Sequence, residues 1–426
     1  MNNLVIICAI LLLVLLFLKV PVYIAVLSAS AVYFIGTPGM NLSIFAQKTI
    51  SGAEGLSLLA IPFFVCAGIF MNYTGVTKRI MNCCEVLTAR MPGGLAQVNI
   101  LLSTLMGGLS GSSLADAAMQ CKMLVPTMES KGYSKSFSTV ITAASGMVVP
   151  LIPPGVGLII YGCINNISIG KLFIAGIGPG IVLCVTLMIF THFLSKKRGY
   201  LPSRTTKIPV SEKIAAVRPA FLPLLLPIII IGGVRIGVFT ASEAGTVAIV
   251  YAVLLGLLYK ELTLKNVMQG CKETVTTTAS IMLIVAAATC FSWILTKEQI
   301  PQQFSQWMIS NIHNKYVFLI MVNIFLLIVG MFIEGNASMI VLAPLLHPVA
   351  MAYGIDDIHF AMVYIFNCTI GAFTPPMGTL MFVSCGITKC PTKDFIKEAV
   401  PFYILFAIDI IVLTYIPQLT TFLVNV

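Results

Sequence analysis

The sequence predicts an all-α polytopic membrane protein built from an inverted repeat, with two re-entrant helical hairpins and two broken helices. Hydrophobic residues make up 58% of its 426 residues and charged residues only 9%, whereas a soluble domain carries about 25% charged residues. The apolar segments are continuous instead of alternating, which favours membrane-spanning helices over a β-barrel. Two similar polar motifs interrupt these segments, one in each half of the chain.

Each motif combines a small polar stretch that contains one carboxylate with a later Pro-Pro pair. The stretches are residues 107–116 with 150–155, and residues 330–338 with 371–378. An offset of 218 residues places Asp116 on Glu334, and an offset of 222 places the first Pro-Pro pair on the second. We therefore expect a four-residue insertion between the two halves of the motif. Short or interrupted segments at matching positions of two halves indicate a binding site.

The N-terminal part of the chain predicts short or interfacial elements. Residues 4–35 are apolar apart from Lys19 and form either one long tilted helix or two short passes. An amphipathic stretch at 41–51 predicts a helix in the interface, and 56–71 is the next apolar run. Residues 72–92 turn polar and are interpreted as an interfacial arm.

The first motif lies among four half-length apolar segments. Residues 95–106 and 114–128 flank the Gly/Ser tip, and each is too short to span comfortably, so they predict a re-entrant hairpin. Residues 137–149 and 156–167 flank the first Pro-Pro pair. The helix must open there, because proline lacks the amide hydrogen and clashes with the preceding turn. A full span is expected at 172–194.

The second half repeats this plan. Spans are expected at 220–234, 244–258, 274–295 and 402–415, hairpin arms at 317–329 and 339–353, and halves of a broken helix at 360–370 and 380–387. If the two halves begin on opposite sides of the membrane, the repeat is inverted, and both breaks face each other near the midplane.

The net charge of +10 does not indicate a nucleic-acid partner, because the basic residues lie at segment ends and in one loop. Between residues 196 and 218, seven Lys and Arg residues, including Lys207, accompany the single acid Glu212. This pattern predicts a cytoplasmic loop. Most of the twelve cysteines lie in apolar stretches and are interpreted as packing residues. The sequence has no nucleotide-binding loop and no nucleophile–base pair, so we expect neither an enzyme nor an organic cofactor.

Opened helices leave backbone groups that need partners in hydrocarbon. Free carbonyls suit a hard cation, and exposed amides at a helix start suit an anion. Ser110, Ser112 and Ser113 at one tip, and Asn336 and Ser338 at the other, add short polar groups. These residue types predict a sodium ion in each half, as the coupling ion, and an anionic solute between them.

Each feature also has a purely structural interpretation. Gly/Ser clusters serve close helix packing, and a Pro-Pro pair can be a simple kink. Recurrence of both features in both halves favours the binding site. Asp116 and Glu334 lie beside the tips, where an ionised carboxylate is costly. Either they form a hydrogen bond or salt bridge that holds the hairpin, or they bind a cation or couple transport to protons.

At these motifs the sequence resembles the large membrane subunit of tripartite ATP-independent periplasmic (TRAP) transporters, the DctM-like family, over essentially the whole chain. The markers are residues 107–116, 150–154, 334–338 and 374–378. The resemblance implies an elevator-type, multi-pass secondary transporter of a bacterial inner membrane. It also implies sodium-coupled import of an organic acid delivered by a periplasmic solute-binding protein. A small four-helix TRAP membrane subunit is expected on a separate chain.

The resemblance also implies the site residues. One sodium ion would contact Gly330, Gly371, Thr374 and Met377, and the other Ser110, Val149, Ile152 and Pro154. The substrate would contact Ser112, Ser113, Asp116, Pro154, Asn336, Ser338 and Pro376, with Glu334 as the coupling candidate. The family often has glycine where this chain has Val149, a change that a backbone carbonyl ligand survives.

The same resemblance implies two functional units. Residues 93–170 and 315–390 would form the mobile transport domain, and residues 1–92, 171–314 and 391–426 the scaffold with the basic loop and the C-terminal helix. A stand-alone sodium- or proton-coupled carboxylate carrier is the alternative, because it shares the repeat. A channel or a membrane enzyme is less favoured, since the polar groups are confined to the tips. The solute remains open among C4-dicarboxylates, sugar acids and keto acids.

Overall fold

The computed structural model describes residues 3–18, 20–204, 206 and 208–425, so Lys19 and Lys207 lie outside the described residues. Within these ranges the chain forms twenty α-helices and one short 3₁₀ helix, with no strand. Six helices are long and apolar enough to cross a membrane, or up to eight if two bent helix pairs each count as one span. The prediction of an all-α polytopic membrane protein is confirmed.

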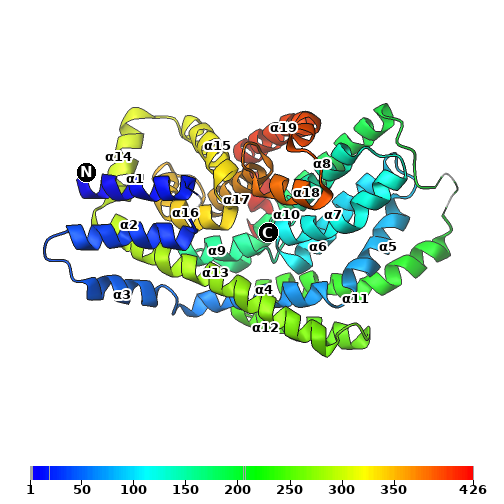
Figure 1. The fold of residues 1–426 in the computed structure, drawn as a ribbon, viewed down its shortest axis with the longest axis horizontal. Helices are drawn as coiled ribbons and strands as arrows, with labels where there is room; N and C mark the ends of the chain where they lie inside the picture. Colours follow the sequence, from blue (N-terminus) through cyan, green and yellow to red (C-terminus); the bar gives the residue numbers. More distant parts are fainter. Residues whose placement is uncertain (1–2, 19, 205, 207, 426) are drawn as a thin grey trace.

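The N-terminal segment forms two short helices instead of one long one. α1 (Asn3–Phe17) and α2 (Val22–Gly36) pack against each other, with Pro21 at the start of α2. α3 (Leu42–Ser51) buries no residue, which agrees with the predicted amphipathic surface helix. Figure 1 shows these three helices together at one end of the molecule. With the last turns of α13 and Val341 of α16 (Gly335–Ala352) they enclose a second, smaller core.

The predicted polar arm is a helix with one buried face. After the 3₁₀ helix (Leu56–Leu59), α4 (Ala60–Asn72) and α5 (Val76–Thr88) meet at an angle of 68°. α5 buries Ile80, Cys83 and Cys84 and packs against α6 and α11. Lys78 and Asn82 lie on the exposed face, whereas Thr77 and Thr88 are buried.

The first tip and the first Pro-Pro break both form where the sequence predicts them. α6 (Gly94–Ser110) and α7 (Ser113–Ser130) pack against each other and are joined at Gly111. Gly111 has φ +61°, a left-handed conformation that glycine adopts without strain. α8 (Lys135–Gly146) and α9 (Val156–Asn165) are separated by the stretch that holds Pro150, Pro153 and Pro154.

The second half repeats these four helices. α15 (Lys315–Phe332) and α16 (Gly335–Ala352) flank the second tip, and α17 (Asp357–Phe373) and α18 (Thr379–Thr388) flank the second break. Both Pro-Pro peptide bonds, 153–154 and 375–376, are cis.

A single offset of about 222 residues relates the two copies, and the predicted four-residue insertion is wrong. The residue that caps α7 is Ser112 and the one that caps α16 is Glu334, 222 positions later. The caps of α8 and α17, Ser134 and Asp356, are also 222 apart. Asp116 therefore corresponds to Ser338, not to Glu334. The offset of 218 pairs the two acidic residues with each other. In the structure each acid is instead equivalent to a hydroxyl residue of the other copy: Glu334 to Ser112, and Asp116 to Ser338.

The remaining helices connect and surround these two copies. They are α10 (Ile169–Lys197), α11 (Val210–Arg235), α12 (Ala241–Leu258), α13 (Leu264–Lys297), α14 (Ile300–Asn311), α19 (Thr392–Tyr415) and α20 (Gln418–Asn425). α13 begins ten residues before the predicted span, because Thr263 caps a polar first part that hydropathy excludes. The predicted last span ends at Tyr415 as α19 does, but one more helix follows it, since α20 continues the chain at an angle of 53° to α19.

Two sets of helices meet at the centre of the molecule. α10, α19 and α20 pack on the hairpins and broken helices, whereas α12 and α13 each pack on α4. In Figure 1, α13 runs diagonally across the lower half, alongside α4 and below α9 and α16. α4 contacts α6 and α9, and α13 contacts α16, so the tips face α4 and α13.

Candidate functional site

A cavity of about 450 Å³ lies where the two tips face α4 and α13. The first residues of four helices line it: Ser113 of α7, Val156 of α9, Gly335 of α16 and Thr379 of α18. The first amide groups of a helix have no intrahelical partner and carry partial positive charge. Four positive helix ends therefore converge on one cavity.

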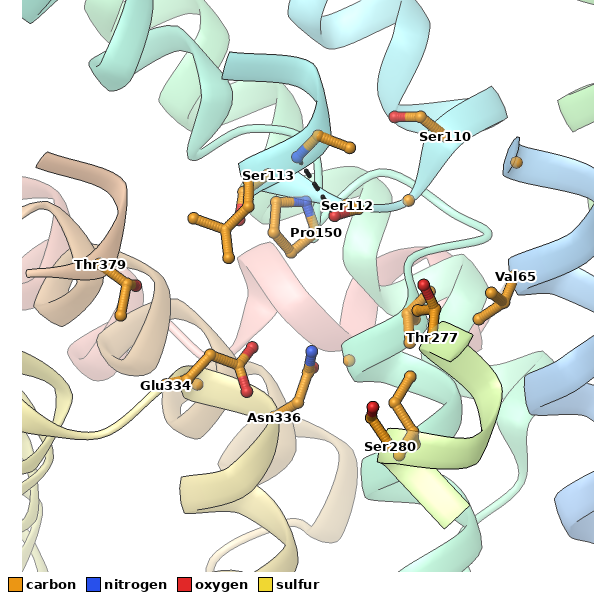
Figure 2. A pocket seen from close by; sticks show the side chains of 18 of the residues that line it. Val65, Ser110, Ser112, Ser113, Pro150, Thr277, Ser280, Glu334, Asn336 and Thr379 are labelled. Carbon is orange, nitrogen blue, oxygen red and sulfur yellow. Dashed lines mark hydrogen bonds between the residues drawn. The ribbon is translucent and has the colours of Figure 1, made fainter. Parts of the chain in front are cut away.

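The first tip presents hydroxyl groups to this cavity. The Ser112 hydroxyl accepts a hydrogen bond from the Ala115 amide at 3.4 Å and so caps α7. Ser110 lines the cavity, and its buried hydroxyl has no hydrogen-bond partner. Figure 2 shows Ser110, Ser112 and Ser113 on one side of the cavity.

The second tip presents a carboxylate and an amide. Glu334 caps α16, because its Oε2 accepts a hydrogen bond from the Ala337 amide at 3.2 Å. Glu334 and Asn336 both line the cavity, and Figure 2 shows them opposite the Ser112 tip. The equivalent caps of the two hairpins therefore differ in charge, with a neutral serine on one side and an acid on the other.

α13 and α4 supply a third polar face that the sequence analysis missed. Thr276, Thr277 and Ser280 of α13 line the cavity, together with Asn72 of α4 (Figure 2 shows Thr277 and Ser280). Ser280 donates its hydroxyl hydrogen to the Thr276 carbonyl at 2.9 Å, so its oxygen is free to accept from a ligand. The signal in the sequence is the run of hydroxyl residues at 274–280, which lies within the expected span 274–295.

Basic side chains are absent from the lining, as far as the described residues show. None of the residues that line the cavity is Lys, Arg or His, and Glu334 is its one carboxylate. The positive groups at the lining are therefore the helix N-termini and not basic side chains.

The first tip and the first break are in close contact. A methyl group on Gly107 would lie 2.9 Å from Cβ of Ile152 and 3.2 Å from the carbonyl oxygen of Val149. A methyl group on Gly111 would lie 2.8 Å from the carbonyl oxygen of Pro154. The residues named for the first sodium ion, Ser110, Val149, Ile152 and Pro154, thus lie in one region where the end of α6 meets the break.

The second tip and the second break meet in the same manner. A methyl group on Gly330 would lie 2.9 Å from Cα of Gly371, so the ends of α15 and α17 touch. The Thr374 amide donates to the Gly371 carbonyl at 3.0 Å, and its hydroxyl donates to the Ile370 carbonyl at 2.8 Å. Met377 is half-buried in the same loop. The last carbonyls of two helices, which carry partial negative charge, converge here.

Of the predicted substrate residues, Ser112, Ser113 and Asn336 line the cavity, and the coupling candidate Glu334 lines it too. Asp116, Pro154, Ser338 and Pro376 do not. The Asp116 Oδ2 accepts hydrogen bonds from Ser103 and Gln120, both at 2.7 Å, inside the first hairpin. The Ser338 carbonyl accepts from the Tyr364 hydroxyl at 3.1 Å. Pro154 is buried and Pro376 is exposed outside the cavity.

The chain matches known proteins along its length. The family model of the tripartite ATP-independent periplasmic transporter, DctM component, matches residues 9–419. The sialic acid TRAP transporter large permease SiaM of Vibrio cholerae is 39% identical, over 96% of each chain. The C4-dicarboxylate TRAP transporter large permease DctM of Pseudomonas aeruginosa is 36% identical over 89% of each chain. The 2,3-diketo-L-gulonate TRAP transporter large permease YiaN of Escherichia coli is 35% identical over 94% of each chain.

Among solved structures, the YdaH transporter of Alcanivorax borkumensis has a similar fold, with a TM-score of 0.58 at 13% identity over 92% of this chain and 96% of that one. The sequence matches confirm the resemblance drawn from the motifs, and with the apolar helices they identify a multi-pass protein of the bacterial inner membrane that is not an enzyme. The chain belongs to the DctM family, the large permease subunits of TRAP transporters.

Proposed function

We propose that this chain is the large membrane subunit of a sodium-coupled TRAP transporter that imports an organic acid by an elevator mechanism. The observation that carries the proposal is the convergence of four helix N-termini on one cavity. Such ends favour an anion. The names of three relatives specify sialic acid, C4-dicarboxylate and 2,3-diketo-L-gulonate, all organic acids.

Sodium coupling is supported by the two places where helix C-termini meet beside the tips. Gly330, Gly371, Thr374 and Met377 would hold one ion, and Ser110, Val149, Ile152 and Pro154 the other. Backbone carbonyls and hydroxyls are the oxygen ligands that hard cations prefer. Because each ion would lie between a tip and a break, its binding would fix the tip in position for the solute. Solute binding would therefore depend on sodium.

The elevator mechanism is supported by the packing of the helices into two groups, one around the tips and breaks and one around α4. Residues 93–170 and 315–390, the two hairpins and two broken helices, would move as one unit. The resemblance assigns α10, α19 and α20 to the scaffold, but they pack on this unit, so we propose that they move with it. α1–α4 and α11–α13 would form the fixed scaffold. The cavity lies between the two units and would be carried across the membrane by their relative movement.

Membership of the family implies two protein partners. A small membrane subunit on a separate chain would brace the scaffold, and a periplasmic solute-binding protein would deliver the organic acid. Exposed apolar faces of the scaffold, including Ile7, Ile10 and Leu13 of α1, are available for lipid and for that subunit.

Reconstitution tests the whole proposal. The chain is placed in proteoliposomes with its small subunit, and uptake of a labelled organic acid is measured with the loaded binding protein outside. We expect uptake to need both an inward sodium gradient and the binding protein. Uptake without the binding protein would identify the alternative, a stand-alone carrier. Uptake driven by a proton gradient in sodium-free buffer would refute the sodium sites.

A further inference from the structure

We propose that a groove between α10 and α19 binds an anionic phospholipid, with the lipid headgroup at the cytoplasmic surface and an acyl chain along the groove. The groove has a volume of about 440 Å³ and shares no residue with the lining of the central cavity. Apolar side chains of α10 and Leu405 of α19 line it, with Thr186 towards one end and Lys197 towards the other. Three observations carry the proposal: a fixed apolar floor, the length of the groove, and a positive charge at one end.

Contacts between α10 and α19 fix the floor of the groove. The Thr186 hydroxyl donates a hydrogen bond to Oδ2 of Asp409 at 3.0 Å. One turn further along α10, the ring of Phe190 packs edge-on against that of Phe402, with 5.0 Å between the ring centroids. Both contacts join a lining residue of α10 to α19. The two helices therefore hold the groove in shape without a ligand.

The outer wall of the groove is apolar and exposed. Ile189 is 53% exposed and Phe193 is 66% exposed, although both lie on a helix that is long and apolar enough to cross a membrane. In such a helix these side chains meet hydrocarbon instead of water. A groove between them can hold a chain of methylene groups through many small van der Waals contacts. A polar headgroup is not expected there, because these side chains offer it no hydrogen bond.

The groove is about as long as one leaflet of a bilayer is thick. Thr186 and Lys197 are 11 positions apart on α10, and a rise of about 1.5 Å per residue makes this distance about 16 Å. The hydrocarbon core of a bilayer is about 30 Å thick, so the groove reaches from the surface of the core to its middle. One lipid of one leaflet therefore matches it, with the headgroup beside Lys197 and the chain end near Thr186.

Positive charge lies at one end of the groove. Lys196 and Lys197 end α10, and both are exposed and form no ion pair in the part of the chain that the structure describes. Arg198, the next residue, is already paired with Glu398 of α19. The basic loop that follows predicts a cytoplasmic location for this end, and anionic lipids are attracted to basic groups at that surface. Two unpaired lysines there favour a headgroup of net negative charge over a zwitterionic one.

A tryptophan placed in the groove can report which lipid occupies it. The chain has two tryptophans, Trp293 and Trp307, and neither lines the groove. With both replaced by phenylalanine, Phe193→Trp provides a single reporter. The complex of this chain with its small subunit is reconstituted in phosphatidylcholine bilayers. Phosphatidylglycerol or phosphatidylcholine with brominated acyl chains, which quench tryptophan fluorescence on contact, is added at increasing mole fractions.

We expect brominated phosphatidylglycerol to reach half-maximal quenching at a mole fraction about fivefold below that of brominated phosphatidylcholine, the factor that one lysine contributes. Leu254→Trp on α12 is the control reporter, because it is exposed outside the groove and, like Phe193, lies four positions before the end of its helix. It should show no preference between the lipids. Equal mole fractions for the two lipids at position 193 would refute the headgroup site. No quenching there by either lipid would show that a protein segment covers the groove, and would also overturn the proposal.

Two pairs of substitutions test the lysines. Lys196→Gln with Lys197→Gln should abolish the preference for phosphatidylglycerol at position 193 and leave quenching by phosphatidylcholine unchanged. Lys265→Gln with Lys272→Gln removes the same charge from exposed positions of α13 and should leave the preference intact. A preference that survives the first pair shows that these lysines do not hold the headgroup.

A second measurement decides if the reporter variants do not fold. Native mass spectrometry of the complex with its own tryptophans counts the phosphatidylglycerol molecules that remain bound in detergent. We expect one fewer molecule in the Lys196→Gln, Lys197→Gln complex than in the wild type or in the α13 control. Equal numbers in all three complexes would refute the site.

Discussion

Gly330 at the end of α15 and Gly371 at the end of α17 lie so close together that a methyl group on Gly371 would be 2.6 Å from Cα of Gly330. Neither backbone can accept a side chain there without moving apart. The contact brings the last carbonyls of both helices to one place, beside Thr374. The proposed sodium site of the second half therefore depends on two glycines that are 41 positions apart in the sequence.

Gly371→Ala should separate these helix ends and abolish sodium-dependent uptake. Overpacking of this kind costs about 1–3 kcal/mol of stability, which a folded transporter can tolerate while the ion site is lost. Gly386→Ala in α18 is the control, because a methyl group there meets nothing within 4 Å. Uptake by the Gly371 variant at the wild-type sodium dependence would show that the contact holds no ion.

Thr374→Val should weaken the binding of sodium and leave the fold intact. The hydroxyl donates its hydrogen to the Ile370 carbonyl, so its oxygen remains free for a cation. Loss of one ligand to a charged ion should raise the half-saturating sodium concentration about tenfold, and Thr374→Ser should restore it. The control is Thr127→Val, which removes the same hydroxyl-to-backbone bond from an exposed position of α7. The measurement is initial uptake as a function of sodium concentration.

Ser112→Ala should reduce uptake by more than the loss of a helix cap explains. Ser112 caps α7 at the cavity, whereas Ser134 caps α8 away from it. Each substitution removes a cap worth about 0.5–2 kcal/mol. If the Ser112 hydroxyl also contacts the solute, its variant loses uptake while Ser134→Ala lowers only the Tm. Equal uptake by the two variants would leave Ser112 with a structural role alone.

Asp116 is expected to hold the first hairpin together and not to bind the solute. Its buried carboxylate is bonded to Ser103 of α6 and Gln120 of α7 and does not line the cavity. Asp116→Ala removes the acceptor that the two side chains share and leaves them only the hydrogen bond from Gln120 to the Ser103 hydroxyl at 2.7 Å. The loss should cost about 1–3 kcal/mol, visible as a lower Tm. Asp116→Asn should keep solute selectivity and sodium dependence. A change of selectivity in the Asn variant would return Asp116 to the binding site.

The sequence predicts some elements of the fold and the site better than others, because their residues carry different kinds of signal. Gly111 and the two Pro-Pro pairs mark positions where a helix cannot continue, so the tips and breaks were predicted closely. The α13 face was missed, because Thr277 and Ser280 are as acceptable in a plain spanning helix as in a cavity wall. The predicted pairing of Asp116 with Glu334 is wrong, because it was based on their shared carboxylate. The correct pairing of the two copies follows from the residues that cap their helices. Those residues can be identified only when the ends of the helices are known.

A disulfide between the two units should stop transport if the elevator moves as proposed. A methyl group on Gly108 of α6 would lie 3.1 Å from Cβ of Pro227 on α11, close to the separation of about 3.8 Å that a disulfide needs. Gly108→Cys with Pro227→Cys, in a background where the exposed Cys271 is serine, should lose uptake on oxidation and regain it with a reductant. The control is Gly256→Cys with Leu262→Cys, a comparable pair at the end of α12 with a separation of 2.9 Å. Both of its residues belong to the scaffold, so oxidation should leave uptake unchanged. If the oxidised double-cysteine variant transports as fast as its reduced form, α6 and α11 do not move apart during the cycle. The boundary between the mobile unit and the scaffold then does not lie between these two helices.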